Sequence, residues 1–457
     1  MDAPAPADPA ILTRRHLLQG LAGLGGLALL PVLGACGAAA PTATPAPAVG
    51  APATTSAAGS PTAAPAASGG KAATLTFWVI SSFTATPDAP LFKAAQQYGA
   101  AHPGVQVKVE SASPTTFRDK LVTAVKGGQG PDIASVDSAW VAGLAAAGVL
   151  APLGDRFAAV ADEFFLGPAQ TGAYLGKQYA APWYTNNVAL FWNKGAFKDA
   201  DLAAPPTNWQ ELVDFGKKLT SGDKYGLMLG AKGFGAFLWF PFAWQNGTTL
   251  LNADGRQAEF GSPAGQEAWQ FYADLYLTDK IVPDALKGAT DSWDQVFAPF
   301  IQEKAAMMLT GDWGIQPVRQ GNPKLDFGIA PLPKGKEAAT VIGGYDLAIP
   351  ATSKNVDAAW DFIRWLTAQE QEGVLQAYKR IQARKDIVDS AYAKQDPLIE
   401  VFIDQSAAGR ARATVPQWDE IENTILADAW DSVILGQSKP ADALNKAVQQ
   451  TNDLLKQ

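Results

Sequence analysis

The chain has 457 residues with 36 Lys and Arg, 44 Asp and Glu, and a formal net charge of −8 at pH 7. This mild acidity, without a stripe of basic residues, argues against nucleic acid as a partner. One Cys and two His exclude a disulfide within the chain, a thiolate metal site, and a catalytic triad or zinc site built on histidine. We therefore expect no metal ion and no cofactor.

The first 36 residues have the pattern of an export signal. Arg14 and Arg15 precede the uncharged apolar run 17–33, and Leu-Gly-Ala-Cys follows at 33–36. A basic start, an apolar run and small residues before the cleavage point are the parts of such a signal. The ending resembles a bacterial lipoprotein signal, so 1–36 is predicted to be a signal peptide with Cys36 lipidated. Twin-Arg and Sec export both remain open, and an uncleaved membrane anchor is the alternative, since about 20 apolar residues can span a bilayer.

Residues 37–70 are predicted to be a disordered linker. They are almost entirely Ala, Pro, Thr, Ser and Gly, without a single charged side chain. Such a segment buries too little apolar surface to offset the entropy of ordering, and 34 residues reach about 30 Å as a flexible coil. The expected location is extracytoplasmic, with the folded part held at the outer face of the cell membrane by lipidated Cys36.

From Lys71 onward, predicted strands and helices alternate. The β-branched and aromatic run 74–80 predicts a strand, and the helical spacing of 91–101 stops at a turn that holds His102. A strand at 105–110, a helix at 116–126, a strand at 133–136 and a helix at 139–147 follow in turn. This alternation predicts an α/β lobe with a mainly parallel sheet.

The second half is richer in helices. Amphipathic spacing predicts them at 208–219, 263–278, 294–303, 356–366, 419–430 and 441–455. Thr207 and Asn208 are both candidates for the N-cap of the first of these helices. The body 71–457 is long enough for two lobes, since a domain commonly takes about 150 residues.

The order of motifs in this body resembles family 1 of the extracellular solute-binding proteins, which deliver sugars to ABC importers. The likeness covers nearly all of 71–457. Its motifs are Gly-Gly-Gln-Gly-Pro-Asp-Ile at 127–133 with Trp140, 147–153, Tyr-Ala-Ala-Pro at 179–182, 186–187 with 190–194, 205–212, 303–307 with Gly-Asp-Trp at 311–313, 327–333, 343–349 and 359–367. One departure is the segment 378–385, which replaces the family's usual Gly-containing approach to its Pro-x-Arg loop.

The resemblance implies an α/β fold of the periplasmic-binding-protein type, with two α/β lobes, a hinge and a ligand cleft between them. Lobe one is expected at 71–183 with 347–392, and lobe two at 187–342 with 396–457. Closure of the hinge around a ligand is what this architecture does.

Aromatic side chains are the first candidates for ligand contact, because sugar rings present flat C–H faces that stack on Trp and Tyr. The chain holds 14 Trp and 10 Tyr. Core packing is favoured for Trp209, Trp269, Trp360, Trp365 and Trp430, which sit at apolar helical spacing. The ligand-binding candidates are Trp78, Trp183, Tyr184, Trp239, Trp244, Trp313 and Tyr345. For Trp78, core packing is equally open, and of Trp239 and Trp244 one is expected to stack on the ligand. Trp183 and Tyr184 lie beside the first crossover, and Trp313 matches the family's stacking position.

Polar side chains would bind the hydroxyl groups of a sugar. Asp137, at a strand end, would either accept a hydrogen bond from the ligand or cap the following helix. One of Asn186 and Asn187 is expected to bind the ligand and the other to be structural, and Asn186 is the candidate for binding. The remaining candidates are Asp312 and Asp346, for which turn capping is the alternative, and Arg384, which lies in the departing segment.

Together these features predict an extracytoplasmic solute-binding receptor and not an enzyme. It would capture a carbohydrate, a di- or oligosaccharide, and deliver it as a monomer to the permease of an ABC importer. The alternatives are an exported enzyme acting on polysaccharide, a binding protein that serves a sensor, and a non-sugar solute such as glycerol phosphate. Acidic and amide groups outnumber bases among the candidates, which favours a neutral polyol.

Overall fold

A computed structural model describes residues 73–80, 83, 88–287, 289 and 293–457. All of them belong to the unit Ala66–Gln457. The predicted signal peptide 1–36, the lipidation site Cys36 and the linker 37–70 lie outside the described residues. Within the described part of the chain, no helix combines the length and the apolar character needed to cross a membrane.

One large sheet contains strands from both halves of the chain, and its main path runs β2, β1, β3, β10, β6, β8, β7. In addition, β9 and β11 pair with β6, β12 pairs with β10, and β4 and β5 form a separate hairpin. The strands are β1 (Ala73–Ile80), β2 (Val105–Ala112), β3 (Ile133–Asp137), β4 (Ala173–Tyr174), β5 (Lys177–Gln178), β6 (Ala180–Asn193), β7 (Tyr225–Met228), β8 (Ala305–Gly311), β9 (Phe327–Ala330), β10 (Thr340–Ala348), β11 (Ile381–Gln382) and β12 (Gly409–Ala411).

The predicted parallel arrangement is correct for the first three strands of this path. Strand β1 pairs in parallel with β2 and with β3. Strand β10 enters antiparallel to both β3 and β6. The sheet is therefore mixed, because β10 runs between β3 and β6 in the direction opposite to both.

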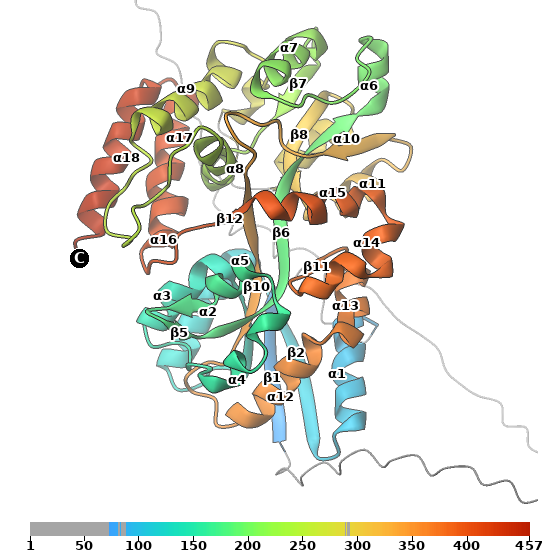
Figure 1. Ribbon diagram of the computed structural model, residues 1–457, viewed down its shortest axis with the longest axis vertical. Helices are drawn as coiled ribbons and strands as arrows, with labels where there is room; N and C mark the ends of the chain where they lie inside the picture. The colour runs from blue at the N-terminus through green and yellow to red at the C-terminus, as the bar shows by residue number, and fades with distance from the viewer. Residues whose placement is uncertain (1–72, 81–82, 84–87, 288, 290–292) are drawn as a thin grey trace, which may run out of the picture. The chain divides into compact units, whose positions relative to one another are not determined.

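Strands β6 and β10 run side by side from one half of the fold to the other (Figure 1). They connect two hydrophobic cores. The first part of β6, 180–187, pairs with β10, and the second part, 188–193, pairs with β8 and β9. Trp183 and Tyr184 belong to the first core, whereas 188–191 belong to the second. We call the elements packed on the first core lobe one and those on the second lobe two. The exact lobe boundaries stay a prediction.

Helices surround this sheet. They are α1 (Pro90–Ala101), α2 (Pro114–Lys126), α3 (Val141–Ala146), α4 (Asp155–Ala158), α5 (Leu166–Thr171), α6 (Lys194–Asp199), α7 (Trp209–Leu219), α8 (Lys232–Gln245), α9 (Pro263–Leu277), α10 (Trp293–Ile301), α11 (Ile315–Gly321), α12 (Val356–Leu366), α13 (Glu372–Ala377), α14 (Ala391–Gln395), α15 (Pro397–Gln405), α16 (Trp418–Glu420), α17 (Ala427–Ile434) and α18 (Pro440–Leu454). A π-helical turn, Ile421–Leu426, joins α16 to α17.

Capping side chains begin several of these helices, among them α6, α7 and α9. Asn208 caps α7, because its side chain accepts a hydrogen bond of 2.9 Å from the backbone N–H of Glu211. Sequence reasoning missed α8, which is buried on almost every side. A helix that is apolar all round has no amphipathic period, so spacing could not reveal it.

Candidate functional site

Asp137 lies at the carboxyl end of β3, on the side of lobe one that faces lobe two. Its Oδ1 accepts a hydrogen bond of 2.9 Å from the backbone N–H of Ala139, at the start of the 3₁₀ turn Ser138–Trp140. The same oxygen accepts a hydrogen bond of 2.7 Å from Nη2 of Arg412. The capping role predicted for Asp137 is therefore present, together with an ion pair that the sequence did not predict.

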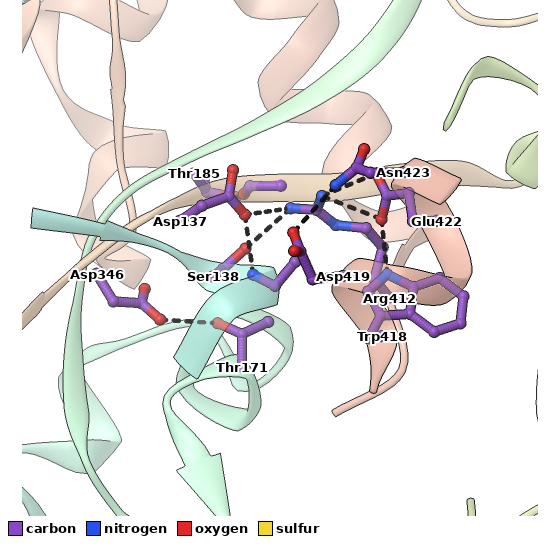
Figure 2. A network of polar contacts seen from close by, with 12 residues as sticks. Asp137, Ser138, Thr171, Thr185, Asp346, Arg412, Trp418, Asp419, Glu422 and Asn423 are labelled. Carbon is purple, nitrogen blue, oxygen red and sulfur yellow. Dashed lines mark hydrogen bonds and ion pairs between the residues drawn. The ribbon is translucent and has the colours of Figure 1, made fainter. Parts of the chain in front are cut away.

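Arg412, which follows β12, is the centre of a buried polar network (Figure 2). Its Nη1 lies 3.2 Å from Oε1 of Glu422, and the two side chains are only 10 % and 6 % exposed. Trp418 donates from Nε1 to Oε2 of Glu422 at 2.6 Å. Burial raises the pKa of the Glu422 carboxyl, and the adjacent guanidinium opposes that shift. The guanidinium thus lies between a carboxylate of lobe one and a carboxylate of lobe two.

A second pair joins Asp312 and Arg380. Asp312 directly follows β8 and is fully buried, and Nη1 of Arg380 lies 3.7 Å from its Oδ2. Within the described part of the chain, neither carboxylate oxygen of Asp312 has a hydrogen-bond partner. Burial raises the pKa of Asp312 to about 6, although Arg380 opposes the shift. The backbone N–H groups of Asp312 and Trp313 also oppose this shift of the pKa. Because Asp312 has no exposed surface, its contact with a ligand hydroxyl stays a prediction.

Aromatic rings line the paired part of β6 and β10. Tyr184 and Tyr345 stack with centroids 5.5 Å apart and an interplanar angle of 18°. Trp140 meets the ring of Tyr345 edge-on at 6.3 Å, and the guanidinium of Arg380 lies 5.8 Å from the ring of Tyr184. The structure therefore brings the predicted residues Tyr184 and Tyr345 together beside both charged networks.

A second aromatic group lies in lobe two. The ring centroid of Trp313 lies 5.0 Å from that of Trp293 and 6.4 Å from that of Phe237. Phe234 stacks on Trp293, with ring centroids 4.2 Å apart. The guanidinium of Arg412 lies 5.5 Å from the ring of Phe237. Trp313 itself is half-buried, so part of its surface is free to meet a ligand.

Two predicted tryptophans lie in the cores. Trp183 is fully buried and packs against Phe77 and Phe83. Trp239 is fully buried and meets Trp269 edge-on at 4.9 Å. Core side chains cover both rings, so we do not carry these two residues into the proposed site.

The two asparagines differ in burial. Asn187 is 1 % exposed, donates to the backbone oxygen of Phe402 at 2.8 Å, and accepts from Nε2 of Gln405 at 2.7 Å. Asn186 is half-buried and lies opposite Gly343 in the β6–β10 pair. Asn187 is thus fixed by the protein's own hydrogen bonds, which leaves Asn186 as the candidate for ligand contact.

Three other candidates have protein partners. Trp78 is half-buried on β1, and Nζ of Lys120 lies 4.1 Å from the centre of its ring. Asp346 is 2 % exposed and accepts from Thr171 at 3.3 Å, and its burial raises its pKa to about 8. Arg384 pairs with Asp386 at 2.8 Å and also with Glu163. These contacts place Arg384 in a different environment from the Asp137–Arg412 network.

A cavity of about 600 Å³ adjoins Arg412, a size within the range of about 300–1,000 Å³ that is common for ligand pockets. Lobe one contributes Gln170 and the hairpin tip 173–176, and lobe two contributes the loop 249–255 and the segment 410–415. Trp244 lines this cavity and is 4 % exposed. Of the two tryptophans in α8, Trp244 is therefore the one that borders open space.

Sequence reasoning missed Arg380, Arg412 and Glu422. Arg380 lies in the departing segment 378–385, from which Arg384 was the predicted contact. The four-residue spacing of Trp418 and Glu422 in a helical stretch is a signal that could have indicated the buried acid. Nothing in the local sequence of Arg412 indicates its partner, because Asp137 is 275 positions away.

Two α/β cores joined by crossing strands, with aromatic rings and paired charges where they meet, define a two-lobed binding protein. Residues 81–373 match the family model of the bacterial extracellular solute-binding proteins. This match covers more than half of the chain, and the chain belongs to that family. The predicted fold class and family are confirmed.

Several curated relatives are similar over most of their length. A putative binding protein of Brucella abortus (strain 2308) is 27 % identical over 79 % of this chain and 88 % of its own length. A maltooligosaccharide ABC transporter solute-binding lipoprotein of Streptococcus pneumoniae (strain R6) is 26 % identical over 78 % of this chain and 83 % of its own. The diacetylchitobiose-binding protein DasA of Streptomyces coelicolor is 24 % identical over 84 % of this chain and 90 % of its own length.

Solved structures are similar in fold. An ABC transporter solute-binding protein of Thermotoga lettingae, bound with α-D-tagatose, has a TM-score of 0.75 and 27 % identity, over 84 % of this chain and 99 % of that one. The GacH receptor of Streptomyces glaucescens, determined with and without acarbose, has a TM-score of 0.73 and 24 % identity. The likeness covers 84 % of this chain and 98 % of that one. The second likeness concerns the fold alone.

Proposed function

We propose that this protein is a receptor that captures a neutral carbohydrate, a di- or oligosaccharide, and delivers it to an ABC importer. The observation that carries the proposal is the grouping of stacked aromatic rings with buried carboxylates at the crossing strands. The rings of Tyr184 and Tyr345 lie beside the Asp312–Arg380 pair, and Arg412 links Asp137 to the aromatic group of Trp313. The named sugar ligands of related proteins support the same class of ligand.

Each part of this grouping suits one part of a sugar. Half-buried rings such as Trp313 and Tyr345 offer flat apolar faces to the C–H side of a pyranose. Asp137, Asn186 and Asp312 offer acceptors to hydroxyl groups, and hydrogen bonds to a charged acceptor are the stronger kind. A ligand held in this way would contact both lobes at once.

The charge distribution favours an uncharged ligand over a phosphate. The guanidinium of Arg412 already faces two carboxylates, those of Asp137 and Glu422. Arg380 faces Asp312. Since both guanidinium groups have carboxylate partners, this region has no positive excess to attract an anion such as glycerol phosphate.

Capture would couple to transport through closure of the lobes. A ligand that binds the closed form more tightly than the open form shifts the population toward the closed form, without making or breaking a bond. The crossing strands β6 and β10 are the natural site of bending, because each passes from one core to the other. The closed form would be presented to the permease, with the chain held at the membrane by lipidated Cys36 and the linker 37–70.

Thermal unfolding of the unit 66–457 with a panel of mono- and oligosaccharides and glycerol phosphate tests this proposal. A ligand at 100 times its dissociation constant should stabilise the fold by about 2.7 kcal/mol. Trp313→Ala should abolish the shift. Trp365→Ala should preserve it, because Trp365 is equally half-buried but packs on Tyr98 and Phe362 in lobe one.

A shift with glycerol phosphate alone would contradict the neutral ligand. Incubation of the same protein with oligosaccharides, followed by chromatography, tests the enzyme alternative. Hydrolysis products that depend on the protein would overturn the receptor.

A further inference from the structure

The two lobes are joined beside the crossing strands by side chains that come from opposite cores. Asp137 ends β3 in lobe one, whereas Arg412 and Glu422 lie in lobe two. A second pair, Arg118 on α2 and Asp419 on α16, has its charged atoms 3.6 Å apart. Figure 2 shows Arg412 between the carboxyls of Asp137 and Glu422.

The backbones of the two lobes also approach closely here. A Cβ atom added to Gly143 of α3 would lie 2.9 Å from the carbonyl oxygen of Pro416. Any other side chain at this position would have to push the segment before α16 away. The separation of the lobes at this point is therefore set by a glycine and held by paired charges.

On another side of Arg412 the lobes do not fill the space between them. The cavity of about 600 Å³ is lined by the hairpin tip 173–176 of lobe one and by the segment 410–415 of lobe two. Leu175 at the hairpin tip is 82 % exposed. Apolar packing between the lobes is therefore incomplete next to Arg412, which gives the ion pairs a larger share in holding the lobes together.

The two carboxylate partners of Arg412 are not equivalent. Glu422 is 6 % exposed and is held by the indole N–H of fully buried Trp418. Asp137 is 22 % exposed. The Arg412–Glu422 pair thus forms the fixed half within lobe two, and the bond to Asp137 is the half that can break when the lobes separate.

We propose that Arg412 is a positioning residue that latches lobe two to lobe one through Asp137 and sets the orientation in which Asp137 meets the ligand. The second half of this statement rests on the proposed function, whereas the latch does not. Because Arg412 stays paired with Glu422 when the latch opens, opening leaves no unpaired guanidinium in the core.

The distance between the lobes in the full chain, without sugar, tests the latch. Since Cys36 is the only cysteine, Cys36→Ser allows one fluorophore at Lys93→Cys on α1 and one at Lys446→Cys on α18, both at exposed positions. Energy transfer between the dyes then reports the separation of the lobes.

Asp137→Asn and Arg412→Gln should both lower the transfer, and Arg412→Lys should restore part of it. Arg410→Gln is the matched control, because Arg410 lies two residues away and pairs with Glu337 at the surface. Asp137→Asn preserves the Arg412–Glu422 pair, so it reports on the latch even if Arg412→Gln fails to fold. Wild-type transfer in Asp137→Asn, or in folded Arg412→Gln, would overturn the latch.

Sugar affinity tests the orientation of Asp137. Arg412→Gln should weaken binding at least about tenfold, mainly by faster dissociation. Arg156→Gln, which removes a surface ion pair with Asp357 within lobe one, should leave binding unchanged. In the double variant with Asp137→Asn the two losses should not add, since both remove the same contact. Additive losses would overturn the positioning role. Wild-type protein that binds no sugar would overturn the proposed function, and the energy transfer would still decide the latch.

Discussion

The rings of Tyr184 on β6 and Tyr345 on β10 stack 5.5 Å apart at the place where these two strands pair. Each strand passes from one core to the other, so this aromatic pair lies at the crossing itself. A ligand that stacks on Tyr345 would therefore contact the strands at which we propose that the fold bends on closure.

Replacing Tyr345 should weaken sugar binding. We expect Tyr345→Ala to reduce affinity about tenfold or more, because an aromatic contact contributes about 0.5–1.5 kcal/mol beyond the area it buries. Tyr345→Phe should bind nearly as well, since the ring face is kept. Isothermal titration with the best sugar of the panel measures both variants. Equal affinity of Tyr345→Ala and wild type would show that this ring does not meet the ligand.

Trp239 should affect stability, not ligand contact. Trp239→Ala removes a fully buried indole from the core of lobe two, and such a change costs about 3–5 kcal/mol. Trp313→Ala should cost clearly less, because Trp313 is half-buried. Urea unfolding of both variants gives the comparison. A stable Trp239→Ala protein that has lost sugar binding would return Trp239 to the site.

The neighbouring asparagines should separate stability from binding. Asn187→Ala removes the acceptor of one N–H group of buried Gln405 and the donor to the backbone oxygen of Phe402, and this should lower the free energy of unfolding by about 1–3 kcal/mol. Asn186→Ala should leave stability near that of wild type and weaken sugar affinity. Thermal unfolding and titration of each variant decide the matter. The reverse assignment would show that Asn187 binds the ligand.

Asp346 should make the protein less stable as pH rises. Its burial, together with the nearby charge of Asp137, raises its pKa to about 8, while Thr171 and Arg412 oppose the shift. In the unfolded chain the pKa returns to about 3.9, so the native state binds more protons between these values. The free energy of unfolding should therefore fall from about pH 4 to about pH 8, by at most about 1.4 kcal/mol per pH unit.

Asp346→Asn cannot ionise, and its amide oxygen can still accept a hydrogen bond from Thr171. Its free energy of unfolding should vary less than that of wild type between about pH 5 and about pH 8. Denaturant unfolding at the two pH values measures the difference. Identical pH dependence of the two proteins would show that Asp346 is already ionised in the native state.

The lipid anchor is tested by changing its attachment site. Cys36→Ala should shift the protein from the membrane fraction to the soluble fraction, and it should lose incorporation of labelled fatty acid. Fractionation of cells that express both forms measures this. Retention of Cys36→Ala in the membrane would support the alternative of an uncleaved anchor through 17–33.

Much of the secondary structure was predictable because it depends on local patterns. The predicted helix at 356–366 has the bounds of α12, and that at 263–278 ends one residue beyond α9. The mostly buried helix α8 was not predicted, since a helix without a polar face shows no period.

For the candidate site, the sequence by itself determined which chemistry is available and roughly where along the chain it lies. Motif order placed Asp137, Tyr184, Asp312, Trp313 and Tyr345 at strand ends and crossovers, and the structure brings these residues close to the crossing strands. Composition excluded histidine and thiolate chemistry, because those side chains are almost absent.

Only the tertiary structure decided which side chains face each other. Trp183 and Tyr184 are neighbours on one strand, yet Trp183 is fully enclosed by core rings while Tyr184 stacks on Tyr345. Arg412 meets Asp137 across 275 positions. Such pairings depend on the order of strands in the sheet and on how two cores approach, and the spacing of residues along the chain holds neither.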